Sequence, residues 1–390
     1  MRRRRFPAIL AITLVGGLGA RAETFESAAP FALLIDDTTG VTLYAKNADQ
    51  PMAPASTAKL MTAEIVFGRI KAGKLSLDDL FTVSQNAWLT GGAKAHGSTM
   101  FLAIKSQVRV EDLLRGMIIQ SGNDAAIVLA EGIAGTEDNF ALAMNARAVE
   151  LGMAHSHFTS PWGKPDPAQL VTAEDMAKLA AHLIHDDPEY YHYFGEKEFT
   201  WDKIRQLNRN PLLLANIGAD GLKTGDTEAS GFGLVASAVA DGRRLIEVIN
   251  GLKSASERAD AARALIAYGQ HDFETAPLYR AGDEVGQADV FGGAVGSVAL
   301  VADDAIALET PKGSTEPVKA AIVYQGPLIA PVAQDAMVAR LKIWRGALLV
   351  VDAPLKTKEA VAVGDLKQRA LGATLQVAGD LLRRALPKWR

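Results

Sequence analysis

The pattern of hydrophobic and polar positions divides the chain into a mixed α/β part followed by a β-rich part. Two apolar runs around a polar turn predict a β-hairpin over residues 32–44. Residues 56–70 are apolar on nearly every side, which is typical of a helix buried at the centre of a domain. Asp241-Gly242 joins two strand-like runs within residues 231–250, and an Asp-Gly pair in that position predicts a second hairpin.

Further helices are expected where apolar residues recur at helical spacing. They cover residues 110–119, 124–133, 172–185 and 259–268. The first two flank a Ser-Gly-Asn turn, where glycine permits an unusual backbone. We expect these helices and hairpins to form one α/β domain over residues 23–270.

The pattern of apolar and polar residues changes after this domain. Short β-branched or apolar runs alternate with clusters of Gly, Pro and Asp, and a helical period is found only over residues 334–341. The runs lie at residues 296–301, 320–324 and 347–351. We therefore expect a small all-β domain over residues 271–364, and it contains no set of residues that suggests catalysis.

The first 22 residues have the pattern of a secretory signal. Arg2–Arg5 form a positive start, residues 8–18 are apolar, and Ala20-Arg21-Ala22 is a small-residue cleavage pattern. The apolar stretch is too short to span a bilayer. We expect export to the periplasm.

The last segment, residues 365–390, combines helical hydrophobic spacing with positive charge. The apolar positions include Leu371, Leu375, Ala378, Leu382 and Ala385. A cationic amphipathic helix of this kind suits the surface of an anionic bilayer. The alternative is an ordinary helix packed on the β domain.

Composition narrows the possible functions. The chain has no cysteine, so thiol chemistry and thiolate metal sites are absent, and stability must come from a sizeable core. The net charge is −4, and loss of the signal with its five arginines makes it −9. This balance argues against nucleic-acid binding.

Three short motifs carry the candidate chemistry: Ser56-Thr57-Ala58-Lys59, Ser121-Gly122-Asn123 and Lys223-Thr224-Gly225. Each alone is weak, and the ordinary interpretations are a helix N-cap, a helix-to-helix turn and a surface turn. In this order they supply a hydroxyl nucleophile, a lysine base, a proton relay and a cation beside the substrate. Together they indicate an acyl-transfer enzyme that uses lysine where others use histidine.

The spacing of the first motif explains how the chemistry would work. Lys59 lies one helical turn after Ser56 on the same face. Burial in an apolar helix near another cation would lower the pKa of the lysine, so that it could accept the serine proton. The backbone N–H of Ser56, at a helix N-terminus, could face a developing oxyanion.

No metal and no cofactor are expected. Five of the seven histidines, at positions 155, 157, 182, 185 and 192, are close in sequence, but their spacing matches no zinc signature. His182 and Asp186, one turn apart, are interpreted as a solvated helix face.

Around these motifs the chain resembles the D-alanyl-D-alanine carboxypeptidases among the low-molecular-mass penicillin-binding proteins. The resemblance is close over residues 25–268. For the β domain and the C-terminal segment it is limited to their order along the chain. It is carried by residues 54–62, 119–125, 199–201, 206–210 and 220–225. It implies a transpeptidase-like or serine β-lactamase-like α/β domain, an antiparallel sheet flanked by helices, with a β-rich domain and attachment to the outer face of the cytoplasmic membrane.

The resemblance also implies a role for each site residue. Ser56 would be the acylated nucleophile, Lys59 its base, Ser121 the proton relay and Asn123 a substrate ligand. Lys223, Thr224 and Gly225 would meet the substrate, Asp226 would give a backbone N–H to the oxyanion hole, and Arg258 with Arg209 would meet the terminal carboxylate. The implied partners are peptidoglycan stem peptides ending in D-Ala–D-Ala and β-lactams as covalent inhibitors.

One departure and two rival functions stay open. Many relatives have histidine or an aromatic residue where this chain has Asp226, which puts the deacylation rate in doubt. A β-lactamase of the same fold would need a water-activating glutamate, and residues 160–172 offer only Asp166. A non-catalytic wall-binding scaffold is disfavoured because all the motif residues are intact.

Overall fold

The computed structural model describes residues 12–14, 25–366 and 368–369, which fall into two compact units. The larger unit holds residues 25–38 and 42–272. The β-rich unit holds residues 12–14 and 39–41 and the described residues from 273 onward. The expected secretory signal, apart from residues 12–14, and nearly all of the expected C-terminal amphipathic helix lie outside the described residues.

A five-stranded antiparallel sheet forms the frame of the larger unit, in the order β3-β2-β10-β9-β8. Its strands are β2 (Phe31–Asp36), β3 (Val41–Lys46), β8 (Ala219–Thr227), β9 (Gly231–Ala240) and β10 (Arg243–Leu252). Both hairpin predictions are confirmed. Asp241 and Gly242 both have positive φ, 52° and 78°, as a tight two-residue turn between twisted strands requires.

The helices of this unit confirm the sequence periodicity where it is strong. They are η1 (Ala55–Ala58), α1 (Lys59–Lys71), η2 (Ala87–Gly91), η3 (Ala93–Ala95), α2 (Val110–Ile119), α3 (Asn123–Ala134), α4 (Glu137–Glu150), α5 (Ala173–His185), α6 (Pro188–Gly195), η4 (Pro211–Leu214) and α7 (Ala255–His271). The predicted central helix begins as the single 3₁₀ turn η1 and continues as α1, whose residues Leu60, Met61 and Phe67 are fully buried. Helix α4 was not predicted, because its apolar residues do not form one stripe: Leu142 and Val149 are exposed.

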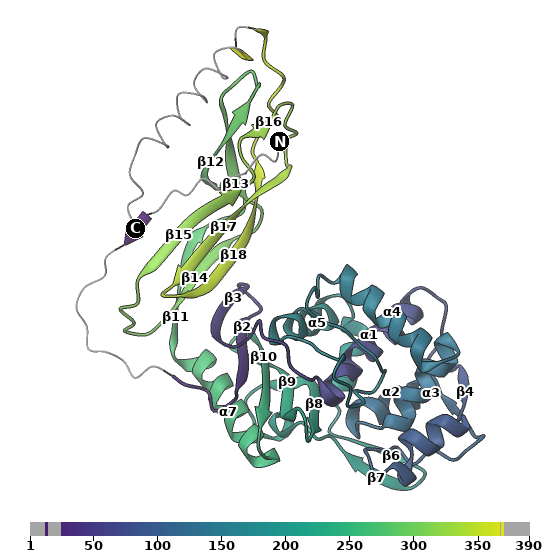
Figure 1. Ribbon diagram of the computed structural model, residues 1–390. Coiled ribbons are helices and arrows are strands. Elements are labelled where there is room, and N and C mark those ends of the chain that lie inside the picture. Colours follow the sequence, from purple (N-terminus) through teal and green to yellow (C-terminus); the bar gives the residue numbers. More distant parts are fainter. Residues whose placement is uncertain (1–11, 15–24, 367, 370–390) are drawn as a thin grey trace. The chain divides into compact units, whose positions relative to one another are not determined.

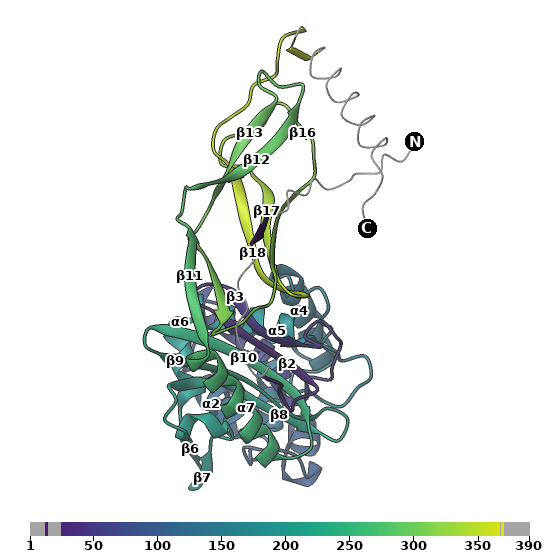
Figure 2. The ribbon, with the colours of Figure 1, turned by 90° about the vertical axis from the view of Figure 1, so that its left-hand side faces the viewer.

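Two layers of helices cover the sheet. Figure 1 shows α7 on one side and the group α1–α5 on the other, and Figure 2 shows α7 lying along the sheet. Ile246 and Val248 of β10 belong to the core shared with the helical group. On the other face, Gly269 of α7 packs so closely that an added Cβ would lie 2.7 Å from Leu34 and 2.8 Å from Leu245. The site motifs lie on the helical side and at the β8 edge.

Small two-stranded ribbons complete the larger unit. They pair β4 (Leu80–Thr82) with β5 (Gln107–Arg109) and β6 (Glu198–Trp201) with β7 (Ile204–Leu207).

The β-rich unit has a seven-stranded sheet in the order β1-β15-β17-β18-β13-β12-β16 and a separate β11–β14 pair. The strands are β1 (Ile12–Leu14), β11 (Phe273–Tyr279), β12 (Glu284–Phe291), β13 (Ser297–Ala302), β14 (Ile306–Pro311), β15 (Val318–Tyr324), β16 (Leu328–Ile329), β17 (Met337–Arg345) and β18 (Leu348–Thr357). The predicted run at residues 320–324 lies within β15, and the runs at 296–301 and 347–351 begin one residue before β13 and β18. In the part of the chain that the structure describes, no helix is long and apolar enough to cross a membrane.

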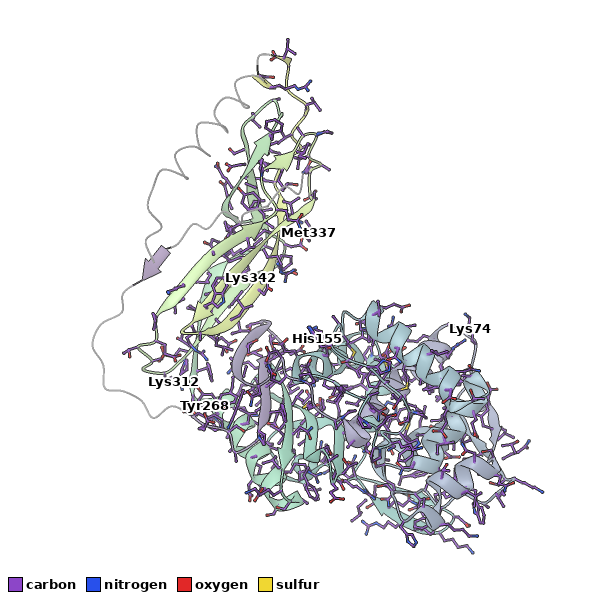
Figure 3. The ribbon with its side chains drawn as sticks, in the orientation of Figure 1. Lys74, His155, Tyr268, Lys312, Met337 and Lys342 are labelled. Atoms are coloured by element: carbon purple, nitrogen blue, oxygen red, sulfur yellow. The ribbon has the colours of Figure 1, made fainter. Side chains whose placement is uncertain are left out.

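The helical period expected over residues 334–341 is wrong. The segment runs into strand β17, on which Figure 3 labels Met337 and Lys342. Ala339, Leu341 and Ile343 are buried at every second position, which is the period of a strand. The partners β15 and β18 on either side provide the ladder that overrides the short helical spacing.

Candidate active site

Ser56 and Lys59 meet at the junction of η1 and α1. The Nζ atom of Lys59 lies 2.8 Å from Ser56 Oγ. Lys59 is the first residue of α1 and is only 1% exposed, whereas Ser56 is half-buried and so can be reached from outside. The 3₁₀ turn therefore brings the hydroxyl and the amine of the first motif into contact.

The same amine has two further neighbours. Lys59 Nζ lies 2.8 Å from Asn123 Oδ1 and 2.7 Å from the backbone carbonyl of Trp162. Burial lowers the pKa of Lys59 well below its ordinary value, and the nearby charges of Lys223 and Arg209 lower the pKa further. A lysine of this kind can be neutral at physiological pH and accept the proton of a hydrogen-bonded hydroxyl.

The Ser121-Gly122-Asn123 turn joins α2 to α3. Ser121 has a left-handed backbone, with φ of 65°, and its buried Oγ has no hydrogen-bond partner among the described residues. Asn123 is held by its backbone N–H, which donates to Ser98 O at 2.8 Å. The carboxylate of Asp124, the next residue, accepts from the N–H of Met100 at 2.8 Å and fixes the neighbouring loop. A buried hydroxyl without a partner is a group that a ligand or a proton-transfer chain can use.

Strand β8 brings the third motif to the edge of the sheet beside η1. Lys223 is 2% exposed, and its Nζ donates to Thr224 O at 3.2 Å. Burial lowers the pKa of Lys223 to about 7, with the charges of Arg209 and Arg258 acting in the same direction. The ammonium of Lys223 therefore titrates near neutral pH.

Gly225 allows β8 to approach the nucleophile's backbone. A Cβ at this position would lie 2.9 Å from Pro54 O, 3.1 Å from Thr57 N and 3.2 Å from Ser56 N. The 2.9 Å contact is closer than real Cβ atoms come to other heavy atoms, so any side chain here would force the backbone to shift. The close approach places the strand edge against Ser56.

Two arginines add positive charge to this part of the unit. Arg258 of α7 is 6% exposed, its guanidinium lies 5.6 Å from the centre of the Phe232 ring, and its Nε has no hydrogen-bond partner in the described part of the chain. Arg209 is half-buried and donates to Ser98 Oγ at 2.6 Å. Burial lowers the pKa values of both arginines, and the negative charge of Asp226, the departure noted above and exposed on β8, acts in the opposite direction.

The three motifs thus lie together in one region of the larger unit. Hydrogen bonds join Ser56, Lys59 and Asn123, and the backbone of Gly225 packs against that of Ser56. Sequence reasoning missed the Trp162 carbonyl and the Ser98 hydroxyl. The carbonyl comes from the backbone, which carries no residue signal, and Ser98 is recognisable only through its contact with Arg209.

Asp166 does not resemble a water-activating group. It is exposed, and its Oδ1 accepts from the backbone N–H of Ala168 at 2.8 Å, within its own loop. The side chain therefore serves the local turn.

Comparison with known proteins agrees with this geometry. Residues 19–254 match the family described as D-alanyl-D-alanine carboxypeptidase, and residues 273–363 match the C-terminal domain of penicillin-binding protein 5. The chain is 38% identical to D-alanyl-D-alanine carboxypeptidase DacD of Salmonella typhimurium over 95% of its own length and 97% of that protein. It is 39% identical to DacC of Escherichia coli over 85% of its own length and 84% of that protein.

Solved structures give the same result. The crystal structure of penicillin-binding protein 5 from Haemophilus influenzae matches with a TM-score of 0.72 and 37% identity, covering 88% of this chain and 100% of that one. Fold and sequence together define a penicillin-binding protein with an α/β transpeptidase-like domain and a C-terminal all-β domain. The chain belongs to the D-alanyl-D-alanine carboxypeptidase family and is a hydrolase with that activity.

Proposed function

We propose that this carboxypeptidase works through an acyl-enzyme on Ser56. In this mechanism neutral Lys59 takes the Ser56 proton as Oγ attacks the carbonyl carbon between the two D-alanines. The C–N bond then breaks, Ser121 passes a proton to the leaving amine, and D-alanine departs. Water hydrolyses the ester and restores the serine hydroxyl.

Positive charge and backbone donors would stabilise the reacting groups. The oxyanion would accept hydrogen bonds from the N–H groups of Ser56 and Asp226. Asn123 would hold a substrate amide, and Gly225 would leave room for the peptide backbone along the edge of β8. The terminal carboxylate would be met by Lys223, Thr224, Arg258 and Arg209, because an exopeptidase must recognise a free chain end.

The observation that carries this proposal is the 2.8 Å contact between Lys59 Nζ and Ser56 Oγ in a buried setting that lowers the lysine pKa. The hydroxyl has a base within hydrogen-bond reach, and the surroundings of that base favour its neutral form by lowering its pKa. β-Lactams would acylate the same serine, since they offer an amide carbonyl next to a carboxylate.

The wider setting is also a proposal. We infer that residues 1–22 direct export, that residues 365–390 associate with the outer face of the cytoplasmic membrane, and that the substrate is the D-Ala–D-Ala end of peptidoglycan stem peptides. The support is the charge and hydropathy pattern of the two terminal segments. We also propose the domain limits 23–270 and 271–364.

A comparison of serine variants tests the mechanism. D-Alanine release from a peptide ending in D-Ala–D-Ala is expected to fall by at least about 10³-fold in Ser56→Ala. Ser76→Ala is the matched control, because Ser76 is an exposed serine in a turn of the same unit. Full activity in Ser56→Ala would contradict the proposal. Penicillin turnover measured in parallel would identify a β-lactamase if it exceeded peptide hydrolysis.

A further inference from the structure

A second group of buried polar side chains joins three helical elements away from the acyl-transfer motifs. Glu64 on α1, His182 on α5 and Asp187 just before α6 each offer one ligand atom, and these atoms lie within 4.8 Å of one another. The side chains of Glu64 and Asp187 are only 2% exposed, and that of His182 is 19% exposed. His182 is therefore partly buried in this cluster, whereas Asp186, at 57% exposed, lies on the solvated helix face that was expected.

Two oxygens of this cluster lack any donor. Glu64 Oε2 and Asp187 Oδ2 are buried and have no hydrogen-bond partner among the described residues. The other oxygen of each carboxyl group accepts a hydrogen bond. Arg147 Nε donates to Glu64 Oε1 at 2.8 Å, and Lys71 Nζ donates to Asp187 Oδ1 at 2.9 Å. A buried carboxylate oxygen with no partner is costly, so this pair calls for a cationic ligand or a proton between them.

Both ring nitrogens of His182 lie close to charged side chains. Its Nδ1 lies 3.0 Å from Asp186 Oδ2, and its Nε2 lies 3.0 Å from an Arg147 nitrogen. Because a guanidinium can only donate, the Arg147 contact is satisfied when Nε2 presents its lone pair and Nδ1 carries the proton toward Asp186, although Nε2 also lies 3.2 Å from Glu64 Oε1. A carboxylate beside one ring nitrogen is the usual arrangement of a metal-binding histidine, and here Arg147 would have to move away from Nε2 before an ion could bind there.

The ion pairs of the cluster leave an excess of negative charge. Four carboxyl groups are in contact with two cationic side chains and with His182. The carboxylates are Glu64, Glu150, Asp186 and Asp187, and the cations are Arg147 and Lys71. A divalent cation would balance the two uncompensated charges. Arg147 is 30% exposed and already donates to Glu150 at 2.7 Å, so its guanidinium has room to turn away from His182.

We propose that Glu64, His182 and Asp187 form a structural site for one divalent transition-metal ion of the zinc type. One imidazole nitrogen and two carboxylate oxygens, with water completing the coordination, suit zinc, whereas magnesium and calcium prefer sites made only of oxygen. The ion would join α1 to the α5–α6 junction, more than a hundred residues later in the chain. Because the ligands are assembled only by folding, metal binding would stabilise the folded state.

Thermal unfolding of the untagged full chain, stripped with a chelator, tests the site. With ZnCl₂ at about 100 times the dissociation constant, the Tm of the larger unit is expected to rise by about 5 °C, with one ion bound per chain by calorimetry. MgCl₂ is expected to give no such shift. Co²⁺ is expected to give a visible absorption band, which reports coordination directly and independently of catalytic activity.

Two histidines on the same helix provide the matched variants. His182→Gln should lose the zinc-dependent Tm shift, weaken zinc binding at least about tenfold and lose the cobalt band. His185→Gln should behave as the unsubstituted protein, because His185 is 59% exposed and pairs with Asp37 outside the cluster. An equal loss of the zinc-dependent Tm shift in both variants would overturn the proposal. So would the absence of any Tm shift with zinc in the unsubstituted protein.

Glu64→Gln tests the competing explanation, in which the carboxyl groups of Glu64 and Asp187 share a proton and bind no metal. The amide of glutamine can donate to Asp187 as a shared proton would. If this variant keeps the Tm of the metal-free protein while zinc leaves the unsubstituted protein unchanged, the oxygens share a proton and the metal site does not exist. Loss of the zinc shift in Glu64→Gln, with the shift present in the unsubstituted protein, supports the metal.

Discussion

At the residue scale, the proposed mechanism makes the pH dependence of acylation a matter of the ionisation of two lysines. Lys59 must be neutral to accept the serine proton, whereas Lys223 must be charged to hold anionic groups, and both pKa values are lowered chiefly by burial. Acylation should therefore fall at low pH as Lys59 gains a proton. It should also fall above about pH 7, where Lys223 loses its proton.

Arg209→Gln is expected to move the whole profile to higher pH. The positive charge of Arg209 lowers the pKa of both Lys59 and Lys223, so its removal raises both values. We expect a shift of about 0.5–1 pH unit in the profile of kcat/KM for acylation by penicillin. Arg205→Gln, which removes an exposed arginine paired with Glu198, is the control and should leave the midpoints unchanged. A lower maximum of kcat/KM with unchanged midpoints of the pH profile would contradict the conclusion that Arg209 lowers the pKa values of the two lysines.

Asp226 is expected to weaken the binding of the anionic substrate end. It pairs across the sheet with Phe232, whose ring lies against Arg258, and its charge acts on Lys223, Arg209 and Arg258 as well as on Lys59. Asp226→Asn should lower KM for a D-Ala–D-Ala peptide about 2- to 10-fold, since a repelling charge is removed. Glu228→Gln removes an exposed acid two residues later and should not change KM. An unchanged or higher KM in Asp226→Asn would show that the carboxylate has another role.

At the element scale, the catalytic geometry depends on how closely β8 approaches η1. In Gly225→Ala the new methyl group would meet backbone atoms of Pro54, Ser56 and Thr57, which cannot rotate away. The strand must shift, and we expect the acylation rate to fall about 10- to 100-fold, as measured by stopped-flow with a fluorescent penicillin. Gly68→Ala is the control: it lies in α1 with no atom within 4 Å of the added Cβ, and it should keep the rate. Similar rates in the two variants would contradict this account.

The same scale shows why some elements were predictable and others were not. The limits of α2 were predicted correctly because its apolar residues form one clear stripe that is buried. Asp241-Gly242 predicted its hairpin because few residue pairs tolerate two positive φ values. The β17 segment misled the prediction because eight residues are too few to separate the two periods, and the strand forms through pairing with segments far away in sequence.

For the site too, contacts set by local sequence could be predicted, and contacts between distant segments could not. Ser56 and Lys59 could be predicted to meet because they lie one helical turn apart. Asn123 was expected beside them only because the three motifs together resemble those of a known family, since no local spacing links it to Lys59. The Trp162 carbonyl could not be predicted, since any residue supplies a carbonyl. The cluster around Glu64 and His182 could not be predicted either, because its ligands come from separate elements and have no characteristic spacing.

At the scale of the whole molecule, a buried acid lowers the stability of the larger unit. Glu247 on β10 is fully buried, neither carboxyl oxygen has a hydrogen-bond partner in the described part of the chain, and burial raises its pKa well above the ordinary value. The unfolded chain releases this proton above about pH 4.5, whereas the folded unit keeps it. Stability therefore falls as pH rises from the unfolded-state pKa toward the raised folded-state pKa.

Glu247→Leu should remove this pH-dependent cost. We expect the free energy of unfolding to rise by about 1–2 kcal/mol at pH 7.5, with a smaller gain at pH 4.5, in urea unfolding curves of the full chain. A gain of equal size at both pH values would show that packing, and not ionisation, is responsible. A loss of stability at pH 7.5 would contradict the account of Glu247.

The central claim is that Ser56 carries the acyl group, and peptide mapping of the penicillin-treated protein by mass spectrometry tests it most directly. We predict one adduct per chain on the peptide that contains Ser56, absent after Ser56→Ala and formed at a strongly reduced rate after Lys59→Ala. An adduct on another residue, or undiminished labelling of Ser56→Ala, would contradict the claim.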